Sequence, residues 1–458
     1  MESTVDTKFP AILEYLPYRK ADGTSIRDEI RLKYLAGFGY VSVRIDIRGS
    51  GNSEGIFDDE YSYQERADCT EILEWIAEQT WSNGKIVMFG KSWGGFNGLQ
   101  MAALQPKHLA GVISAYSTDD RYSDDIHYCG GCIPAGEACP PHPEYQGGIE
   151  AKSDLFAVWK DRLDNLVPLD TYWFKHQTRE PILDSASPAK VSLCSPQQTG
   201  TASGNWLGWG FLKHPDHSLD QRIDDGRSLC FDSSPLLDDL ELFGFPSVQL
   251  SLSSNQPNAL LCVRLCAIEP ETCASILVAR GILNLTHFNS HEHPEELEIN
   301  KIYNIDLTLS GVCARLSAGY RLRLAVSTAY WPFVWPSPQS ATVTIHLNRS
   351  SPSVLILPRL AHKCSSKPDF DLPEIAPGLK EITIRDDSIS SIRTFDEINE
   401  ISTLKITKDN GCILYPDGHL FDETSDSVYE INEYGPQTAR VQIQRNAKTI
   451  PYRTICRS

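Results

Sequence analysis

The segment KIVMFGKSWGGFNGLQMAALQ, residues 85–105, constrains the fold more than any other part of the sequence. A strand-like apolar run ends at Phe89, and GKSWG at 90–94 matches Gly-x-Ser-x-Gly directly before a helical run. A nucleophile on so tight a strand-to-helix turn needs glycine on either side, because flanking side chains would collide. The turn exposes the hydroxyl above the sheet and aims helix amides at developing negative charge. By itself the motif also describes an ordinary glycine turn; in this context it predicts Ser92 as a nucleophile.

The sequence around this motif alternates as a parallel sheet requires. The strand-like runs FPAILEYL, YVSVRIDI, KIVMFG and AGVISAYS are separated by amphipathic helical runs. Such alternation indicates α/β architecture with helices on both faces of the sheet. From about Asp232 to Leu347 the period changes to two, which predicts an antiparallel β-sandwich or jelly roll. Further on, TLKITKDNGCILYPDG predicts a hairpin that turns at residues 409–411.

These patterns divide the 458 residues into four parts. Residues 1–118 are expected to form a partial α/β-hydrolase core, and residues 119–183 a reduced helical cap. Residues 184–227, rich in Ser, Gly, Gln and Asn, are expected to be a linker or junction. Residues 228–458 are expected to form the C-terminal β-sandwich.

Composition excludes several classes of protein. Sixty acidic residues against 42 basic ones give a net charge of −18. A surface this acidic repels phosphate backbones and anionic headgroups, so we expect neither a nucleic acid nor a membrane as a partner. The sequence has no apolar run of spanning length and no N-terminal export pattern. Together with thirteen scattered cysteines, an odd number, this predicts reduced thiols in the cytoplasm.

Tyr18 is the candidate second donor for the nucleophile. It follows the first strand in EYLPYRK, and in a hydrolase of this shape the loop after that strand faces the nucleophile and completes the oxyanion hole. Alternatively, Pro17 and Tyr18 only close a turn. The later segment RIDIRGSGNSEG fits neither phosphate-binding spacing, so it predicts a tight turn anchored by Asp46 and Arg48.

In this order, these segments and STDDRYSDDIHYCGG after the next strand resemble the CocE/NonD hydrolases, the family of X-Pro dipeptidyl-peptidases and cocaine esterase. SLDQRIDDGRSLCFDSSPL, GILNLTHFNSHEHPEEL and LRLAVSTAYWPFVWPSP resemble the family's C-terminal jelly-roll domain, so the likeness covers most of residues 8–347. The resemblance implies that Ser92 is acylated and that the Trp93 backbone N–H and the Tyr18 hydroxyl form the oxyanion hole. It implies small ester, amide or peptide substrates, including peptides with penultimate proline, and no cofactor.

The sequence also departs from the family pattern. Family members carry a strand ending in the triad aspartate and a Trp-x-His segment after the cap, whereas here the cap-like helices run directly into ASGNWLGWGFLKHPDHSLDQRIDDG. The family's first strands also precede the segment that begins here at Phe9. His214 and His217 are candidate replacement bases, although both suit an ordinary surface loop. Three hypotheses stay open: an active serine hydrolase, a catalytically impaired binding protein, and an incomplete gene model of an active hydrolase.

Three further clusters have both a functional and an ordinary interpretation. The first is a set of soft ligands at zinc-like spacing, the second a group of histidines on a possible strand face, and the third an acidic turn that suits a substrate ammonium group. As ordinary loop residues they need no function, and we expect no metal site. A sheet with unpaired edges would also favour self-association, so a homo-oligomer is a possible assembly. The clusters are Cys129, Cys132, Cys139 and His142; His287, His291 and His293; and Asp119, Asp120, Asp124 and Asp125.

Overall fold

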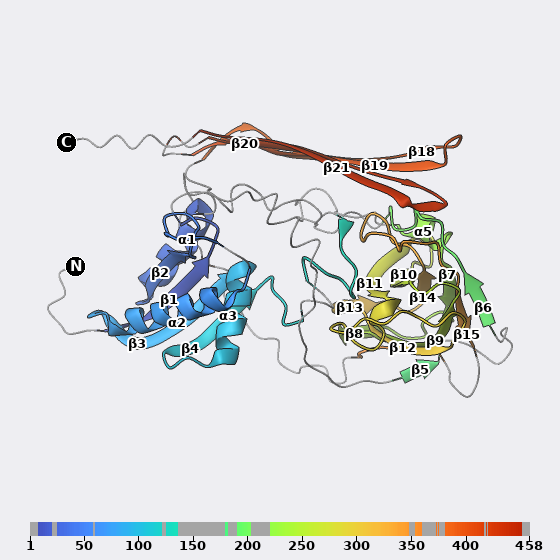
Figure 1. Ribbon diagram of the computed structural model, residues 1–458, viewed down its shortest axis with the longest axis horizontal. Coiled ribbons are helices and arrows are strands. Elements are labelled where there is room, and N and C mark those ends of the chain that lie inside the picture. The colour runs from blue at the N-terminus through green and yellow to red at the C-terminus, as the bar shows by residue number, and fades with distance from the viewer. Residues whose placement is uncertain are drawn as a thin grey trace. The chain divides into compact units, whose positions relative to one another are not determined.

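The structure, a computed structural model, consists of two compact units (Figure 1). The first contains residues 1–119, 140–166 and 368–381, and the second contains residues 120–139, 167–367 and 382–458. The residues that the structure describes are 8–20, 25–57, 60–120, 125–135, 179–181, 190–202, 220–347, 353–359, 372, 374, 381–415, 418 and 420–450.

The first unit is built on a four-stranded parallel sheet in the order β2-β1-β3-β4. Because all four strands run the same way, their carboxyl ends meet at one edge of the sheet. This confirms the α/β architecture expected from the alternating runs. The strands are β1 (Phe9–Leu16), β2 (Val41–Asp46), β3 (Ser82–Lys91) and β4 (Leu109–Ala115), and the helices are α1 (Ser25–Gly37), α2 (Tyr63–Glu78) and α3 (Trp93–Leu104).

The two faces of this sheet have different chemistry. On one face Leu13, Tyr15 and Met88 pack with buried residues of α2 and α3 in an apolar cluster. On the other face Glu14 is buried and forms ion pairs with Arg31 of α1 and Arg44 of β2. Since side chains of a strand alternate between faces, one strand, β1, serves both an apolar and an ionic interface.

The second unit contains a β-sandwich, which confirms the change to period two. One sheet has the order β11-β10-β14-β7, and a six-stranded sheet holds β5, β16, β9, β15, β6 and β12; β13 pairs with β8. Leu, Val and Ile from these sheets form the core between them. The strands are β5 (Arg179–Pro181), β6 (Lys190–Leu193), β7 (Leu229–Asp232), β8 (Leu240–Gly244), β9 (Ser247–Ser254), β10 (Leu260–Ile268), β11 (Ser275–Asn284), β12 (Tyr303–Thr308), β13 (Val312–Leu316), β14 (Arg321–Ser327), β15 (Val343–His346) and β16 (Val354–Ile356), with the short helices α5 (Arg222–Asp225) and η2 (Leu285–His287).

Two short strands from the segments expected to be the cap and the junction belong to this sandwich. β6, inside the expected junction 184–227, pairs with β15, and β5, at the end of the expected cap 119–183, pairs with β16. Most of the expected cap lies outside the described residues. Cys132, in its described part, packs with Leu260 and Ile282.

The C-terminal residues form a separate five-stranded antiparallel sheet, drawn in orange and red in Figure 1, rather than further sandwich strands. The predicted hairpin turn at 409–411 is wrong: β19 runs through it, and only its register shifts between Asp409 and Cys412. Asp409 accepts the Gly411 N–H at 2.9 Å and binds Arg385, so the turn-like residues form an irregularity within the strand. The strands are β17 (Ile382–Arg385), β18 (Ser388–Asp396), β19 (Ile401–Leu414), β20 (Leu420–Asn432) and β21 (Gly435–Ile450).

Candidate active site

Ser92 lies on the turn between β3 and α3, as the sequence predicts. Its backbone has φ 57° and ψ −120°, a conformation that residues other than glycine rarely adopt. The Ser92 N–H donates to the Ala115 carbonyl at 2.8 Å, and the Ser92 carbonyl accepts the N–H groups of Gly95 at 2.7 Å and Phe96 at 3.0 Å. These bonds fix the strained residue between the end of β4 and the first turn of α3.

The two glycines of the motif are not equivalent. A Cβ on Gly90 would lie 1.9 Å from the carbonyl carbon of Gly94, whereas a Cβ on Gly94 would meet nothing closer than 3.5 Å. The expected collision therefore occurs at Gly90 and not at Gly94. Two further glycines of α3 are tightly enclosed, because a Cβ on Gly95 would lie 2.7 Å from the Ser117 hydroxyl and one on Gly98 would lie 2.6 Å from Val112. We did not predict a role for Gly95 or Gly98, although both stand in the segment W-G-G-F-N-G.

The three predicted site residues lie together. The Tyr18 hydroxyl donates to Ser92 Oγ at 3.1 Å, and the Trp93 backbone N–H donates to the Tyr18 oxygen at 3.4 Å. Both donors of the expected oxyanion hole therefore point to the same small region beside the nucleophile. The two donors bond to each other, and Tyr18 also bonds to Ser92.

Asp46 holds the loop that carries Tyr18. Its buried carboxylate accepts the Lys20 backbone N–H at 2.6 Å and the Lys20 ammonium at 3.2 Å. It also accepts the Asn52 N–H at 3.0 Å, so it anchors the predicted turn after β2 as well. Arg48, expected to share that task, binds Asp68 of α2 in a two-point contact with both distances at 2.7 Å. The link from Asp46 to the loop after β1 was not predicted, because it joins parts of the chain that the sequence keeps apart.

Glu65 fixes the side chain of Trp93. The Trp93 indole N–H donates to Glu65 Oε1 at 2.8 Å, while the indole ring packs against Phe57 and Tyr61. Burial raises the pKa of Glu65, and hydrogen bonds from Trp93 and Asn97 oppose that rise. The only signal for Glu65 in the sequence is indirect, since Ser62 and Glu65 have the spacing of a capping box at the start of α2.

No histidine of the described part of the first unit stands beside Ser92. His108 is the one histidine there; it precedes β4, at the opposite end of the sheet from Ser92, and its Nδ1 lies 3.2 Å from the Gly84 carbonyl. The candidate bases His214 and His217 lie outside the described residues. We therefore assign the proton acceptor to no described residue of this unit.

The other predicted clusters have structural surroundings of their own. Cys129 and Cys132 form a backbone bridge, and burial raises the pKa of the Cys132 thiol, which disfavours the thiolate that a metal needs. His287 Nδ1 lies 3.2 Å from His291 Nδ1, and His293 is exposed. Among the described residues, no group of three or more His, Cys, Asp or Glu side chains could hold a metal ion. Cys139, His142 and Asp124 lie outside those residues.

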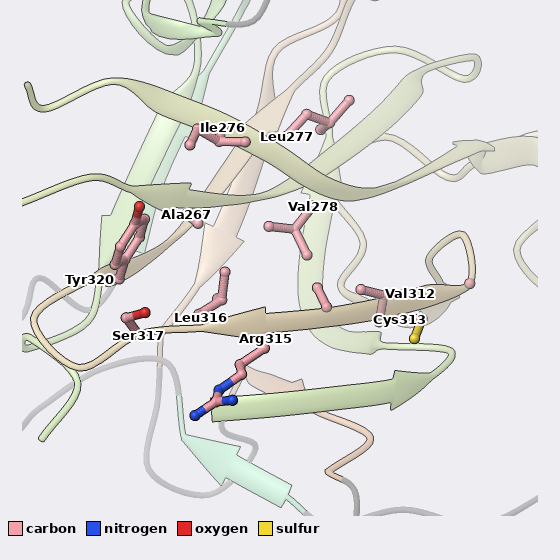
Figure 2. A pocket seen from close by; sticks show the side chains of 12 residues that line it. Ala267, Ile276, Leu277, Val278, Val312, Cys313, Arg315, Leu316, Ser317 and Tyr320 are labelled. Atoms are coloured by element: carbon pink, nitrogen blue, oxygen red, sulfur yellow. The ribbon is translucent and has the colours of Figure 1, made fainter. Parts of the chain in front are cut away.

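The acidic turn divides between the two units, with Asp119 ending one stretch of the first unit and Asp120 beginning the second. Asp125, also in the second unit, is buried and accepts the Ile126 N–H at 2.5 Å. A cleft of about 370 Å³ opens between β11 and β13 (Figure 2). Only sandwich residues line it, Val278, Leu316 and Tyr320 among them, so it includes none of the predicted site residues.

Two models of known protein families together match most of the chain. The family model for X-Pro dipeptidyl-peptidase (S15 family) matches residues 3–206, and the model for the X-Pro dipeptidyl-peptidase C-terminal non-catalytic domain matches residues 164–367. Cocaine esterase from Rhodococcus sp. (strain MB1 Bresler) is 32% identical over 134 residues, which are 28% of this chain and 22% of that protein. Two mycobacterial relatives are matched over 16% of their length. The chain thus matches less than a quarter of these curated relatives.

Solved structures have the same fold over a larger part of the chain. An aminopeptidase from a marine sediment Thaumarchaeota archaeon superposes with a TM-score of 0.61 at 13% identity, covering 78% of this chain and 92% of that one. A CocE/NonD family hydrolase from Staphylococcus aureus gives a TM-score of 0.54 at 15% identity, covering 78% and 90%. At these identities the likeness is one of fold. No helix in the described part of the chain is long and apolar enough to cross a membrane.

Proposed function

Since the chain belongs to the CocE/NonD family of X-Pro dipeptidyl-peptidase-like hydrolases, we propose that it cleaves small esters or peptides through an acyl-enzyme at Ser92. The observation that carries the proposal is the position of the Tyr18 hydroxyl, which lies 3.1 Å from Ser92 Oγ and 3.4 Å from the Trp93 backbone nitrogen. A nucleophile beside two convergent donors is the arrangement that acyl transfer requires.

In the proposed reaction, Ser92 Oγ attacks the carbonyl carbon of the substrate and gives its proton to a base. The carbonyl oxygen becomes negative as the C–O bond to serine forms. The Trp93 N–H and the Tyr18 O–H then turn from their mutual contact to this oxygen. Collapse of the intermediate breaks the bond to the alcohol or amine, which leaves with the proton held by the base. Water then attacks the acyl carbon, the bond to Ser92 Oγ breaks, and the serine regains its proton. Each donor is expected to contribute about 10² to 10³ in turnover.

The substrate class rests on the relatives. The names of the related proteins include an esterase and an aminopeptidase, and the family model is that of X-Pro dipeptidyl-peptidase. All of these reactions present a carbonyl carbon next to an alcohol or amine leaving group, which suits the same donors. We accordingly propose a small ester, or a peptide with penultimate proline, as the substrate.

Hydrolysis of a p-nitrophenyl ester and of an Xaa-Pro-p-nitroanilide tests the proposal. We expect Ser92→Ala to abolish turnover and Tyr18→Phe to lower kcat by about 10² to 10³ with little change in KM, because the lost bond forms in the transition state. Tyr34→Phe is the matched control, since the Tyr34 hydroxyl binds Glu374 on the surface of the same unit.

If Tyr18→Phe behaves like Tyr34→Phe, Tyr18 is not part of the site. If the folded wild-type protein turns over neither substrate, the hydrolase proposal fails and a non-catalytic binding role takes its place.

A further inference from the structure

The side chain of Glu65 reaches beyond the start of its own helix, although its sequence context favours a local bond there. Glu65 is the third residue of α2, and its N–H donates to the N-cap hydroxyl of Ser62 at 3.2 Å. In a capping box the glutamate would return a bond to the N-cap N–H. Here the residue is only 5% exposed, and its carboxylate binds two groups of another helix, with a further backbone hydrogen bond at Tyr61, just before the N-cap. These hydrogen bonds offset the loss of water only in part, so the pKa of the Glu65 carboxyl stays raised.

One carboxylate oxygen joins two positions of the helix that follows the nucleophile. Glu65 Oε1 accepts the Trp93 indole N–H at 2.8 Å and the Asn97 amide N–H at 2.7 Å. Trp93 supplies the backbone N–H of the proposed oxyanion hole, and Asn97 lies one turn later on α3. Glu65 therefore fixes both the rotation of α3 and the side chain next to Ser92.

The same network reaches the strand that leads to Tyr18. The Asn97 amide also donates to the Tyr15 carbonyl at 3.2 Å, and the Tyr15 hydroxyl donates to the Glu65 carbonyl at 3.3 Å. Tyr15 is buried on β1, three residues before Tyr18. β1, which leads into the loop of Tyr18, and α3, which carries the Trp93 N–H, are thus both tied to one residue of α2.

We propose that Glu65 is a positioning residue that sets the orientation of the Trp93 backbone N–H relative to Ser92 and Tyr18. This inference rests on the proposed function for its catalytic meaning, while its geometric content concerns the Trp93 amide alone. Displacement of reacting groups by about 1 Å can cost about 10²-fold in rate, so a lost tether should be visible in reactivity.

The experiment combines two variants with two measurements. Glu65→Gln keeps an acceptor oxygen for Trp93 and Asn97, whereas Glu65→Leu removes it. The first measurement is the second-order rate of labelling by a fluorophosphonate. The second is the position of the Trp93 backbone amide resonance in ¹⁵N-tryptophan-labelled protein, where the nine tryptophans give few signals and Trp93→Phe identifies the correct one.

We expect Glu65→Leu to shift the Trp93 amide and slow labelling about 10²-fold, and Glu65→Gln to restore both to near wild type. The same substitutions at Glu14 are the control, because Glu14 is also buried in this unit but binds Arg31 and Arg44 rather than α3. If Glu65→Leu fails to fold, Glu65→Asp replaces it, since its carboxylate is one methylene shorter.

An unmoved Trp93 amide in folded Glu65→Leu, or in Glu65→Asp where that variant replaces it, overturns the inference whatever the labelling rate. So does an equal loss in the Glu14 variants, which would indicate general destabilisation. If the wild type does not label, the proposed function fails, and the inference is then decided by the amide resonance alone.

Discussion

Gly90→Ala should damage the first unit far more than Gly94→Ala, although both glycines belong to the same motif. A Cβ on Gly90 would lie 1.9 Å from the Gly94 carbonyl carbon and 2.0 Å from its oxygen. Separations below 3.0 Å are essentially never seen for real Cβ atoms, so the strand-to-helix turn that carries Ser92, here called the elbow, must open by about 1 Å. A Cβ on Gly94 would have its nearest contact, 3.5 Å, with Leu16, which is ordinary van der Waals distance.

The magnitude follows from this displacement. Forced overpacking costs about 1–3 kcal/mol and sometimes more, and here the obstructing atoms are backbone, which cannot rotate aside. For a unit of this size, about 3 kcal/mol lowers Tm by roughly 10 °C. A shift of about 1 Å between Ser92 and its donors should also reduce reactivity by about 10²-fold. Gly94→Ala should change unfolding free energy by less than about 1 kcal/mol, because it adds no clash.

Urea unfolding and the fluorophosphonate labelling rate of the folded protein measure both effects. The comparison is internal, because the two variants gain the same methyl group four residues apart. Equal stability and equal labelling of Gly90→Ala and Gly94→Ala would refute the argument that backbone contact across the elbow makes Gly90 obligatory.

Two further predictions concern the second unit. Arg264 is fully buried and binds Asp225 at 2.9 Å, so Arg264→Met leaves a buried carboxylate less compensated and should cost about 3–5 kcal/mol in urea unfolding. Arg315→Met, at an exposed pair with Asp239, is the control and should leave the urea midpoint nearly unchanged. Equal losses in the two variants would contradict this reasoning. Burial, with the neighbouring His291, lowers the pKa of His287 from 6.5 to about 4. As the pH falls, the unfolded chain therefore binds a proton at His287 before the folded chain does. The free energy of unfolding should fall as pH drops from about 6.5 to about 4, by about 1 kcal/mol for a partly buried group. His287→Asn should flatten this part of the profile, and an unchanged slope would exclude His287 as its cause.

The regular part of the fold was predictable because its periodicity is strong. The four strands and three helices of residues 9–115 lie where apolar runs and amphipathic runs alternate. The sandwich strands were likewise predictable, since in β9 the apolar residues Leu250 and Leu252 alternate with polar glutamine and serine residues. The three or four residues of β5 and β6 are too few for a period to be recognised.

The C-terminal sheet was harder to predict because its strands are long and polar. Residues 388–396, SISSIRTFD, are mostly exposed in β18, so burial imposes little pattern on them. Asp409, Asn410 and Gly411 are good turn residues, and Gly411 does have a positive φ of 82°. The chain uses that conformation for a register shift inside β19, where Arg385 binds Asp409 from the neighbouring strand. Local turn chemistry cannot distinguish these two outcomes.

Within the candidate site, the residues with a motif were predictable and those with a long-range partner were not. Ser92, Trp93 and Tyr18 each occupy a position that the strand-turn-helix pattern defines, and the structure brings their donor and acceptor atoms together. Glu65 and Asp46 act through partners 26 to 32 residues away in sequence. Their roles depend on which face of a helix or which strand end meets the elbow, and that is a property of the assembled sheet.

The most direct test of Ser92 as the nucleophile is the mass of the peptide that contains Ser92 after treatment of the folded protein with a fluorophosphonate. We predict one phosphonyl adduct, located on Ser92, lost in Ser92→Ala and formed more slowly in Tyr18→Phe. An unmodified Ser92 in folded protein, or an adduct on a different residue, would contradict the claim that this hydroxyl is a nucleophile poised beside two oxyanion donors.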